Sequence, residues 1–166
     1  MAGDLRHVQP HELPVWWSLV RDRVASACER SSGKYQPADI LKQLVDGQMQ
    51  LWAVLDEEPE ASEDETKRLQ GSRARQATEG PQIKAIAITE ISQFPRARVC
   101  RVLACTGDVV DDWLDHLSEI ESWAHARGCT AIEPVARPGW ERRLNSRGYR
   151  KTHVVLEKTL IAEKAT

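Results

Sequence analysis

The residues that most directly suggest chemistry form a strand-to-helix turn, Thr106-Gly107-Asp108. An apolar strand, Arg98–Thr106, precedes the turn, and a helix that extends to Arg127 follows it. The apolar residues of that helix recur at three- and four-residue steps: Val110, Trp113, Leu114, Leu117, Ile120 and Ala124. Backbone N–H groups at such a helix start bind phosphate and other anions. The turn is therefore a candidate anion site, with Thr106 or Asp108 available to cap the helix.

The charges beside this turn favour a different interpretation. The helix start is crowded by acids, namely Asp108, Asp111, Asp112 and Asp115. No Arg or Lys lies between Arg101 and Arg127. Carboxylates stabilise a helix start by about 0.3–1 kcal/mol each, whereas two like charges about 5 Å apart repel by roughly 3 kcal/mol at an effective dielectric of about 20. The local sequence thus predicts acids that cap a helix rather than a phosphate site.

Other reactive or charged residues fall into three groups. The cysteines Cys28, Cys100, Cys105 and Cys129 form no CxxC pair and have no His at metal-ligand spacing, so we expect free buried thiols and no metal. Trp16 and Trp17 are either core residues or an aromatic patch that binds a partner. A basic cluster could hold phosphate, a nucleic-acid backbone or an acidic partner, or could be a solvated face: Arg137, Arg142, Arg143, Arg147, Arg150 and Lys151. His116 and His125 are predicted to lie on the surface.

Composition limits the class of protein. The chain has 166 residues, of which 41% are hydrophobic and 29% charged, with a net charge of −2. These values are typical of one globular domain, residues 1–166, and give no reason to expect binding to nucleic acid. No apolar run approaches the roughly 18 residues of a membrane span, and the first residues do not resemble a signal peptide. We therefore expect a cytoplasmic protein.

Periodicity predicts an α/β fold. The expected order is a strand at 5–9, helices at 11–30 and 38–45, a hairpin of strands 51–55 and 83–91, strand 98–106, the helix to 127, strand 131–136, a short helix at 140–146 and a last strand at 149–160. Between the hairpin strands lies a charged insertion at about 56–81, which is either a solvated loop or an arm that docks on a partner. Together these elements predict a mixed, mostly antiparallel central sheet with helices on both faces.

The end of the chain carries a family resemblance. Gly128-Cys129-Thr130-Ala131-Ile132 is followed by Trp140-Glu141-Arg142-Arg143-Leu144 and by Gly148-Tyr149-Arg150. From about Leu5 to Leu160, the sequence resembles the GNAT superfamily of N-acetyltransferases. The resemblance implies that the turn after the central strand would hold the pyrophosphate of acetyl-CoA through main-chain N–H groups. The implied cofactor-binding residues are Cys105, Gly107, Asp108 and Val109.

Departures from the family pattern lead to two hypotheses. The turn has a single glycine, Gly107, and Leu144 stands where the family often has a Tyr acid. The resemblance implies a general base on a central strand, with Glu90 the first candidate and Glu133 the second. The first hypothesis is a GNAT-like protein with an eroded acetyl-CoA site that uses no cofactor and binds a protein partner or takes part in an assembly. Its contact residues would be Trp16, Trp17, Arg142, Arg143 and Arg147.

In overall pattern the sequence looks like GNAT-like chains of phage genomes, which would place the protein in the host cytoplasm or in the virion. The alternative hypothesis is an active N-acetyltransferase that uses acetyl-CoA to modify an unknown amine. The sequence identifies neither the amine, nor the partner, nor the oligomeric state.

Overall fold

The computed structural model describes residues 3–56, 82–107, 113–136 and 138–160. The chain divides into two compact units, Met1–Val135 and Ala136–Thr166. The first unit contains β1 (Asp4–Val8), the 3-10 helix η1 (Pro10–Glu12), α1 (Leu13–Glu29), α2 (Pro37–Val45), β2 (Met49–Leu55), β3 (Ile83–Gln93), β4 (Arg98–Gly107), α5 (Leu117–Ala126) and β5 (Ala131–Pro134). The second contains the 3-10 helix η2 (Pro138–Trp140) and α6 (Glu141–Asn145).

The sheet of the first unit is mixed and mostly antiparallel, as predicted. Its five strands lie in chain order, β1-β2-β3-β4-β5. The first four are antiparallel, and only β4 and β5 are parallel. The predicted hairpin is β2 and β3, and the Asp56 N–H donates to the Gln82 carbonyl (2.8 Å) where these strands end. Residues 57–81 of the charged insertion lie outside the described residues.

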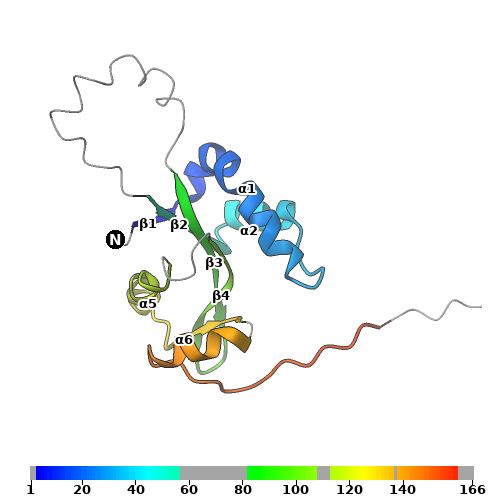
Figure 1. Ribbon diagram of the computed structural model, residues 1–166, viewed down its shortest axis with the longest axis vertical. Helices are drawn as coiled ribbons and strands as arrows, with labels where there is room; N and C mark the ends of the chain where they lie inside the picture. The colour runs from blue at the N-terminus through cyan, green and yellow to red at the C-terminus, as the bar shows by residue number, and fades with distance from the viewer. Residues whose placement is uncertain (1–2, 57–81, 108–112, 137, 161–166) are drawn as a thin grey trace, which may run out of the picture. The chain divides into compact units, whose positions relative to one another are not determined.

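Helices cover both faces of this sheet, which confirms that part of the prediction. In Figure 1, α1 and α2 lie on one side of the strands and α5 lies on the other. The α1/α2 face has a large core that includes Val20, Val24, Leu44, Leu51 and Ile88. The α5 face is smaller and more aromatic, with Trp52, Ala87 and Ile120 at its centre and Trp123 packed against them. Alternating residues of β2, Leu51 and Trp52, enter opposite cores, as the period of a strand requires.

Local signals set the ends of the first helices. Pro14 lies in the first turn of α1 and Pro37 in the first turn of α2. Proline is tolerated there because the N–H groups of a first turn form no hydrogen bond within the helix. The Asp39 carboxylate accepts the Gln36 N–H (2.9 Å) at the start of α2. Gly47, with φ of 69°, takes the left-handed conformation that ends this helix. The positions of the two predicted N-terminal helices are thus close to the observed ones.

Two predictions at the other end of the chain are wrong. Residues 149–160 form no strand: no neighbouring strand pairs with them, and Lys151 to Leu160 are exposed. Of the helix expected between Gly107 and Arg127, Trp113 and Leu114 are helical, residues 115–116 form a turn, and α5 follows from Leu117 with His116 as its N-cap. Residues 108–112, among them the candidate cap Asp108, lie outside the described residues. His116 is buried, with 6% of its surface exposed. Because His116 lies in the turn between these helical residues and α5, the helical spacing that placed it on the surface does not apply.

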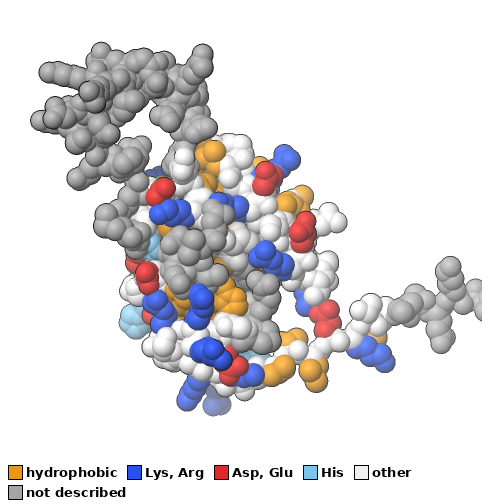
Figure 2. Space-filling model, in the orientation of Figure 1, with side chains coloured by type: hydrophobic (Ala, Val, Ile, Leu, Met, Phe, Trp, Pro, Cys, Tyr) orange, Lys and Arg blue, Asp and Glu red, His pale blue; other side chains and the backbone are white. Residues whose placement is uncertain are grey.

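Three further findings concern the surface charge, membrane spans and metal ligands. Figure 2 shows Lys and Arg side chains interspersed with Asp and Glu side chains over the visible face, in keeping with the small net charge. Within the part of the chain that the structure describes, no helix is both long and apolar enough to cross a bilayer. The same residues contain no group of three or more His, Cys, Asp or Glu side chains that could hold a metal ion.

Candidate functional site

The two parallel strands of the sheet are paired over only part of β4. Pairing with β5 extends from Val99 to Val102 of β4. At its end, Pro134 of β5 has no N–H to donate. Beyond this point none of the described strands pairs with this side of β4 from Leu103 to Gly107. Main-chain N–H and C=O groups on such an open edge can bind an extended ligand as another strand would bind them.

A β-bulge lies where the two strands cease to pair. In the register of β3 with β4, Thr89 is opposite Val102 but Ile88 is opposite Ala104. Leu103 is therefore an extra residue on β4. A bulge bends its strand and increases the local twist, which accounts for the loss of pairing with β5. The bulge thus produces an open strand edge, Leu103–Gly107, inside an otherwise regular sheet.

Gly107 ends this edge at a position that no larger residue fits. A Cβ atom added there would lie 2.7 Å from the Ala85 Cβ and 3.3 Å from the Lys84 carbonyl oxygen. Both neighbours belong to β3, which pairs with β4 up to this point. A glycine allows the close approach of the two strands. The single glycine predicted at the turn is therefore required by packing.

A hollow of about 290 Å³ lies between α1 and the end of β4. It is lined by Asp22, Arg23, Ser26, Arg30, Thr106 and Gly107; we call it the β4-end hollow. The Arg23 guanidinium is held in place because it donates to the Ile83 carbonyl (2.7 Å). Two guanidinium groups and one carboxylate give the lining a net charge of +1. The hollow therefore has the charge that suits an anion.

Thr106 adds an unusual feature to this hollow. Only 8% of the residue is exposed, and its Oγ1 has no hydrogen-bond partner among the described residues. Buried hydroxyl groups almost always have a partner. Since Thr106 lines the hollow, this hydroxyl marks a position at which a further polar group would be stabilised. Thr106 was predicted as a possible cap of the following helix, but within the described residues its hydroxyl makes no such hydrogen bond.

The two candidate bases lie in one row across the sheet. Glu90 of β3 is opposite Arg101 of β4, which in turn is opposite Glu133 of β5. Arg101 Nη1 donates to Glu90 Oε1 (3.0 Å), and the two side chains are 38% and 23% exposed. Both candidate bases therefore lie at strand positions next to Arg101, and Glu90 contacts its guanidinium. This arrangement leaves them accessible, and it also gives Glu90 a structural partner.

The described cysteines are all free thiols, as expected from their spacing. Burial raises the pKa of Cys100 to about 12, and it also raises the pKa of Cys105 strongly. A thiol whose pKa is raised in this way stays protonated and is a poor nucleophile. Cys105 therefore contributes to the open edge through its main chain.

The remaining predicted residues are spread over the molecule. Trp16 is buried at 8% exposure in the α1/α2 core, while Trp17 is half-buried against the same core. Three exposed arginines lie in the second unit, on α6 or just after it: Arg142, Arg143 and Arg147. Asp108 and Val109 lie outside the described residues.

Sequence reasoning missed the arginines that supply charge to the β4-end hollow. The sequence has no Arg or Lys between Arg101 and Arg127, near the turn, whereas Arg23 belongs to α1 and Arg30 is the C-cap of that helix. The helix spacing of Asp22, Ser26 and Arg30, four residues apart, does show that they share one side of a helix. What the spacing cannot show is that this side lies beside the end of β4.

The fold is similar to those of several solved acetyltransferase structures. An aminoglycoside acetyltransferase from an uncultured soil metagenomic sample matches with a TM-score of 0.62 and 12% identity, over 98% of this chain and 100% of that chain. A predicted acetyltransferase from Clostridium acetobutylicum, solved with acetyl-CoA, has a TM-score of 0.58 and 14% identity, over 94% and 95%. A GNAT family acetyltransferase from Staphylococcus aureus has a TM-score of 0.56 and 14% identity, over 96% and 100%.

No protein-family model matches the chain, and no curated protein matches it. At these low identities the structural similarity establishes the fold and not the activity. The chain has a GNAT-like fold, as the sequence resemblance implied.

Proposed function

We propose that this protein binds acetyl-CoA along the open edge of β4 and transfers the acetyl group to an amine. The observation that carries the proposal is the unpaired edge Leu103–Gly107, which ends beside a hollow of net positive charge. A pantetheine chain is extended and has amide groups that can pair with a strand edge, and the pyrophosphate is anionic. The Clostridium acetobutylicum structure named above was solved with acetyl-CoA, which supports the proposal by analogy of fold.

The described residues fit this cofactor. The main chain from Leu103 to Cys105 would hold the pantetheine amides. Gly107, Arg23 and Arg30 would hold the phosphates, and the orphaned Thr106 hydroxyl would add a donor. Arg23 and Arg30 would also bring positive charge to the end of β4, where the local sequence supplies only acids. Asp108 and Val109 remain predicted contacts.

Proton transfer is the chemistry that the chain itself would supply. The bound cofactor would provide the activated acetyl group. The amine acceptor has to lose a proton, and Glu90 is our first candidate to accept it. Because Oε1 of Glu90 already accepts a hydrogen bond from Arg101, we assign this role to Oε2. Glu133 is the second candidate, and Leu144 at the family's Tyr position cannot supply the acid.

Isothermal titration with acetyl-CoA at low and moderate salt is the first test. We expect micromolar binding that weakens as salt is added, because part of the affinity is electrostatic. Arg23→Gln should weaken binding by about tenfold, since a hydrogen bond to a charged group contributes about 1.5–3 kcal/mol. Arg30→Gln should have a smaller effect of about threefold, since exposed charge pairs contribute about 0.2–1 kcal/mol.

Arg21→Gln is the matched control, because Arg21 is exposed on the same helix but does not line the hollow. No heat at about 1 mM ligand, or equal affinity in all three variants, would contradict the proposed site. If binding is confirmed, a panel of amines that includes aminoglycosides should be tested with acetyl-CoA. A Glu90→Gln variant that retains binding but loses turnover would support Glu90 as the base.

A second candidate function is a non-catalytic protein that binds a partner. Two observations favour it: Leu144 lacks a proton to donate, and Glu90 is ion-paired with Arg101. Its contacts would be Trp17 in the first unit and the exposed arginines of the second unit. Phage origin and a place in the virion stay predictions from the sequence pattern. Failure to bind acetyl-CoA, together with a complex that Arg142→Glu disrupts, would favour this candidate.

A further inference from the structure

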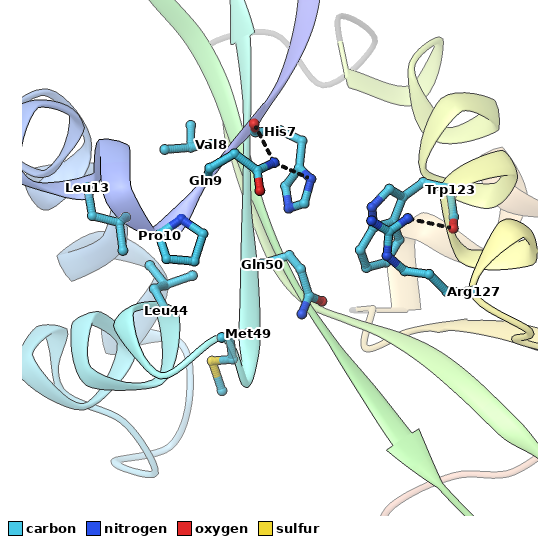
Figure 3. A pocket seen from close by; sticks show the side chains of 11 residues that line it. His7, Val8, Gln9, Pro10, Leu13, Leu44, Met49, Gln50, Trp123 and Arg127 are labelled. Atoms are coloured by element: carbon cyan, nitrogen blue, oxygen red, sulfur yellow. Dashed lines mark hydrogen bonds between the residues drawn. The ribbon is translucent and has the colours of Figure 1, made fainter.

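A second pocket, of about 180 Å³, lies at the opposite end of the first unit, where β1 ends and β2 begins. Its lining is drawn in Figure 3: His7, Val8, Gln9, Pro10, Leu13, Leu44, Met49, Gln50, Trp123 and Arg127, together with Gly47. We call it the His7 pocket. It shares no lining residue with the β4-end hollow. Its chemistry is therefore independent of the proposed acetyl-CoA site.

One wall of the His7 pocket is apolar. Pro10, Leu13, Leu44 and Met49 come from the α1/α2 side of the sheet, and three of them are at most 5% exposed in the folded chain. Figure 3 shows this group on one side of the β2 strand and Trp123 with Arg127 of α5 on the other. Between them, Gln50 extends from the strand. The pocket thus has an apolar side and a polar side.

The amide of Gln50 is oriented by a buried relay. Trp52 Nε1 donates to Thr89 Oγ1 (3.0 Å), and Thr89 Oγ1 donates to Gln50 Oε1 (3.0 Å). An indole N–H can only donate, so the Thr89 hydroxyl proton is available for the Gln50 oxygen. Thr89 itself is fully buried. With its oxygen engaged, Gln50 offers the pocket its NH₂ group.

His7 is oriented in a similar way. Gln9 Nε2 lies 3.0 Å from His7 Nδ1 and 3.4 Å from the His7 carbonyl oxygen. An amide nitrogen donates, so His7 Nδ1 is assigned as an acceptor and the ring proton to Nε2. The imidazole stacks on Trp52 with 4.4 Å between ring centroids. His7 therefore contributes a further donor, Nε2–H.

Trp123 and Arg127 complete the polar side. Trp123 Nε1 is buried and has no hydrogen-bond partner among the described residues. The Arg127 guanidinium lies over the Trp123 ring, 4.1 Å from its centroid. Among the described residues, Arg127 Nη1 donates a long hydrogen bond (3.4 Å) to the Trp123 carbonyl. Both side chains thus have donors available for a ligand, and one of them is charged.

We propose that the His7 pocket binds a small monocarboxylate with an apolar body. The polar groups identified above, on Gln50, His7, Trp123 and Arg127, are all donors, and a carboxylate is the acceptor-only group that complements them. The single guanidinium supplies charge for one carboxylate, and the apolar wall suits a hydrocarbon body. An apolar cavity of about 150 Å³ accepts benzene, so the size of this pocket suits a molecule such as benzoate.

The test is a titration of the full chain with benzoate, in which binding is monitored by NMR chemical-shift changes and by tryptophan fluorescence. We expect saturable binding with a Kd of about 1 mM or tighter. Benzamide, which has the same shape without the charge, should bind at least about tenfold more weakly, as expected when a charged hydrogen bond is lost. Benzoate should leave acetyl-CoA binding unchanged, so the outcomes for the two sites are separable.

Two variants and one control make the test specific. Arg127→Gln should weaken benzoate binding by about tenfold, and Trp123→Phe, which removes the N–H and keeps an aromatic ring, by about threefold. Arg21→Gln should bind as the parent chain does, because Arg21 does not line this pocket. Equal affinity for benzoate and benzamide, shifts confined to residues outside the pocket, or no saturation by about 10 mM would overturn the proposal.

Discussion

The hydrophobic cores on the two faces of the sheet differ in size and in the residue types that form them. The α1/α2 face is a continuous core of thirteen buried residues, most of them aliphatic. On the α5 face, the described residues include two clusters of three buried residues each, and tryptophan, alanine and cysteine provide most of them. Three buried side-chain polar atoms of the described residues have no hydrogen-bond partner, and two of them, His116 Nε2 and Trp123 Nε1, belong to α5 or its N-cap. The comparison indicates that one face provides stability while the other tolerates polar groups that a ligand can use.

The largest effect should come from a matched pair of core truncations. Leu51→Ala and Ile120→Ala each remove the same number of carbon atoms from side chains that are 0% and 1% exposed. Such truncations cost about 2–5 kcal/mol of unfolding free energy, and the cost increases with the volume of cavity that remains. We expect Leu51→Ala near the upper end, because its surroundings are closely packed. Ile120→Ala should lie near the lower end, since partly exposed neighbours can move inward. Urea unfolding of both variants, with unchanged m-values, is the measurement; a larger loss for Ile120→Ala would contradict the comparison.

A second prediction concerns the buried relay on the α5 face. Thr89→Val keeps the shape of the side chain but leaves the Trp52 indole N–H without its acceptor at 3.0 Å. A buried donor without a partner costs about 1–3 kcal/mol, so the unfolding free energy should fall by that amount. Ser122→Ala is the control, because Ser122 is exposed and its hydroxyl bonds only within α5. The control should change stability by less than about 0.5 kcal/mol. Equal stability of Thr89→Val and the parent chain would show that the relay is not structural.

The third prediction is the pH dependence that His7 confers. Partial burial, and next the charge of Arg127, lower the pKa of His7 below its ordinary value of 6.5, while Glu12 opposes this shift. Below pH 6.5 the unfolded chain therefore binds a proton more readily than the folded chain does. Stability should be fully present above that pH and should be lost as the pH falls toward the lowered pKa.

Thermal unfolding between about pH 5 and 8 is the measurement, with His7→Gln as the comparison. The variant should lose part of this dependence. Glu12 does not contribute to the pH dependence in this range. The Gln9 N–H, and next Arg6, lower the pKa of Glu12 below 4.5, so this carboxyl titrates at more acidic pH. A variant with the same pH dependence as the parent chain would exclude His7 as its source.

Sequence patterns predicted the parts of the fold that depend on local order. Alternation in Ile83–Ile91 identified β3 and its hairpin, and Pro37 with Gly47 identified α2. The strand expected at 149–160 failed because a strand exists only where another strand pairs with it, and alternation cannot show that. Of the residues in the proposed site, Gly107 and the candidate bases Glu90 and Glu133 were predicted from the sequence. Arg23 and Arg30 were not, since contacts between α1 and β4 are set by tertiary packing.

The smallest expected effect concerns Glu90 and Arg101, and it decides between two interpretations of Glu90. Both side chains are partly exposed and lie on adjacent strands with a 3.0 Å contact. A double-mutant cycle with Glu90→Gln and Arg101→Gln should give a coupling of about 0.2–1 kcal/mol in unfolding free energy, as exposed cross-strand pairs do. A coupling this small means that Glu90 is not retained for stability, which leaves proton transfer as its proposed role. If the coupling were above about 2 kcal/mol, Glu90 would be a structural residue, and Glu133 would become the base to test.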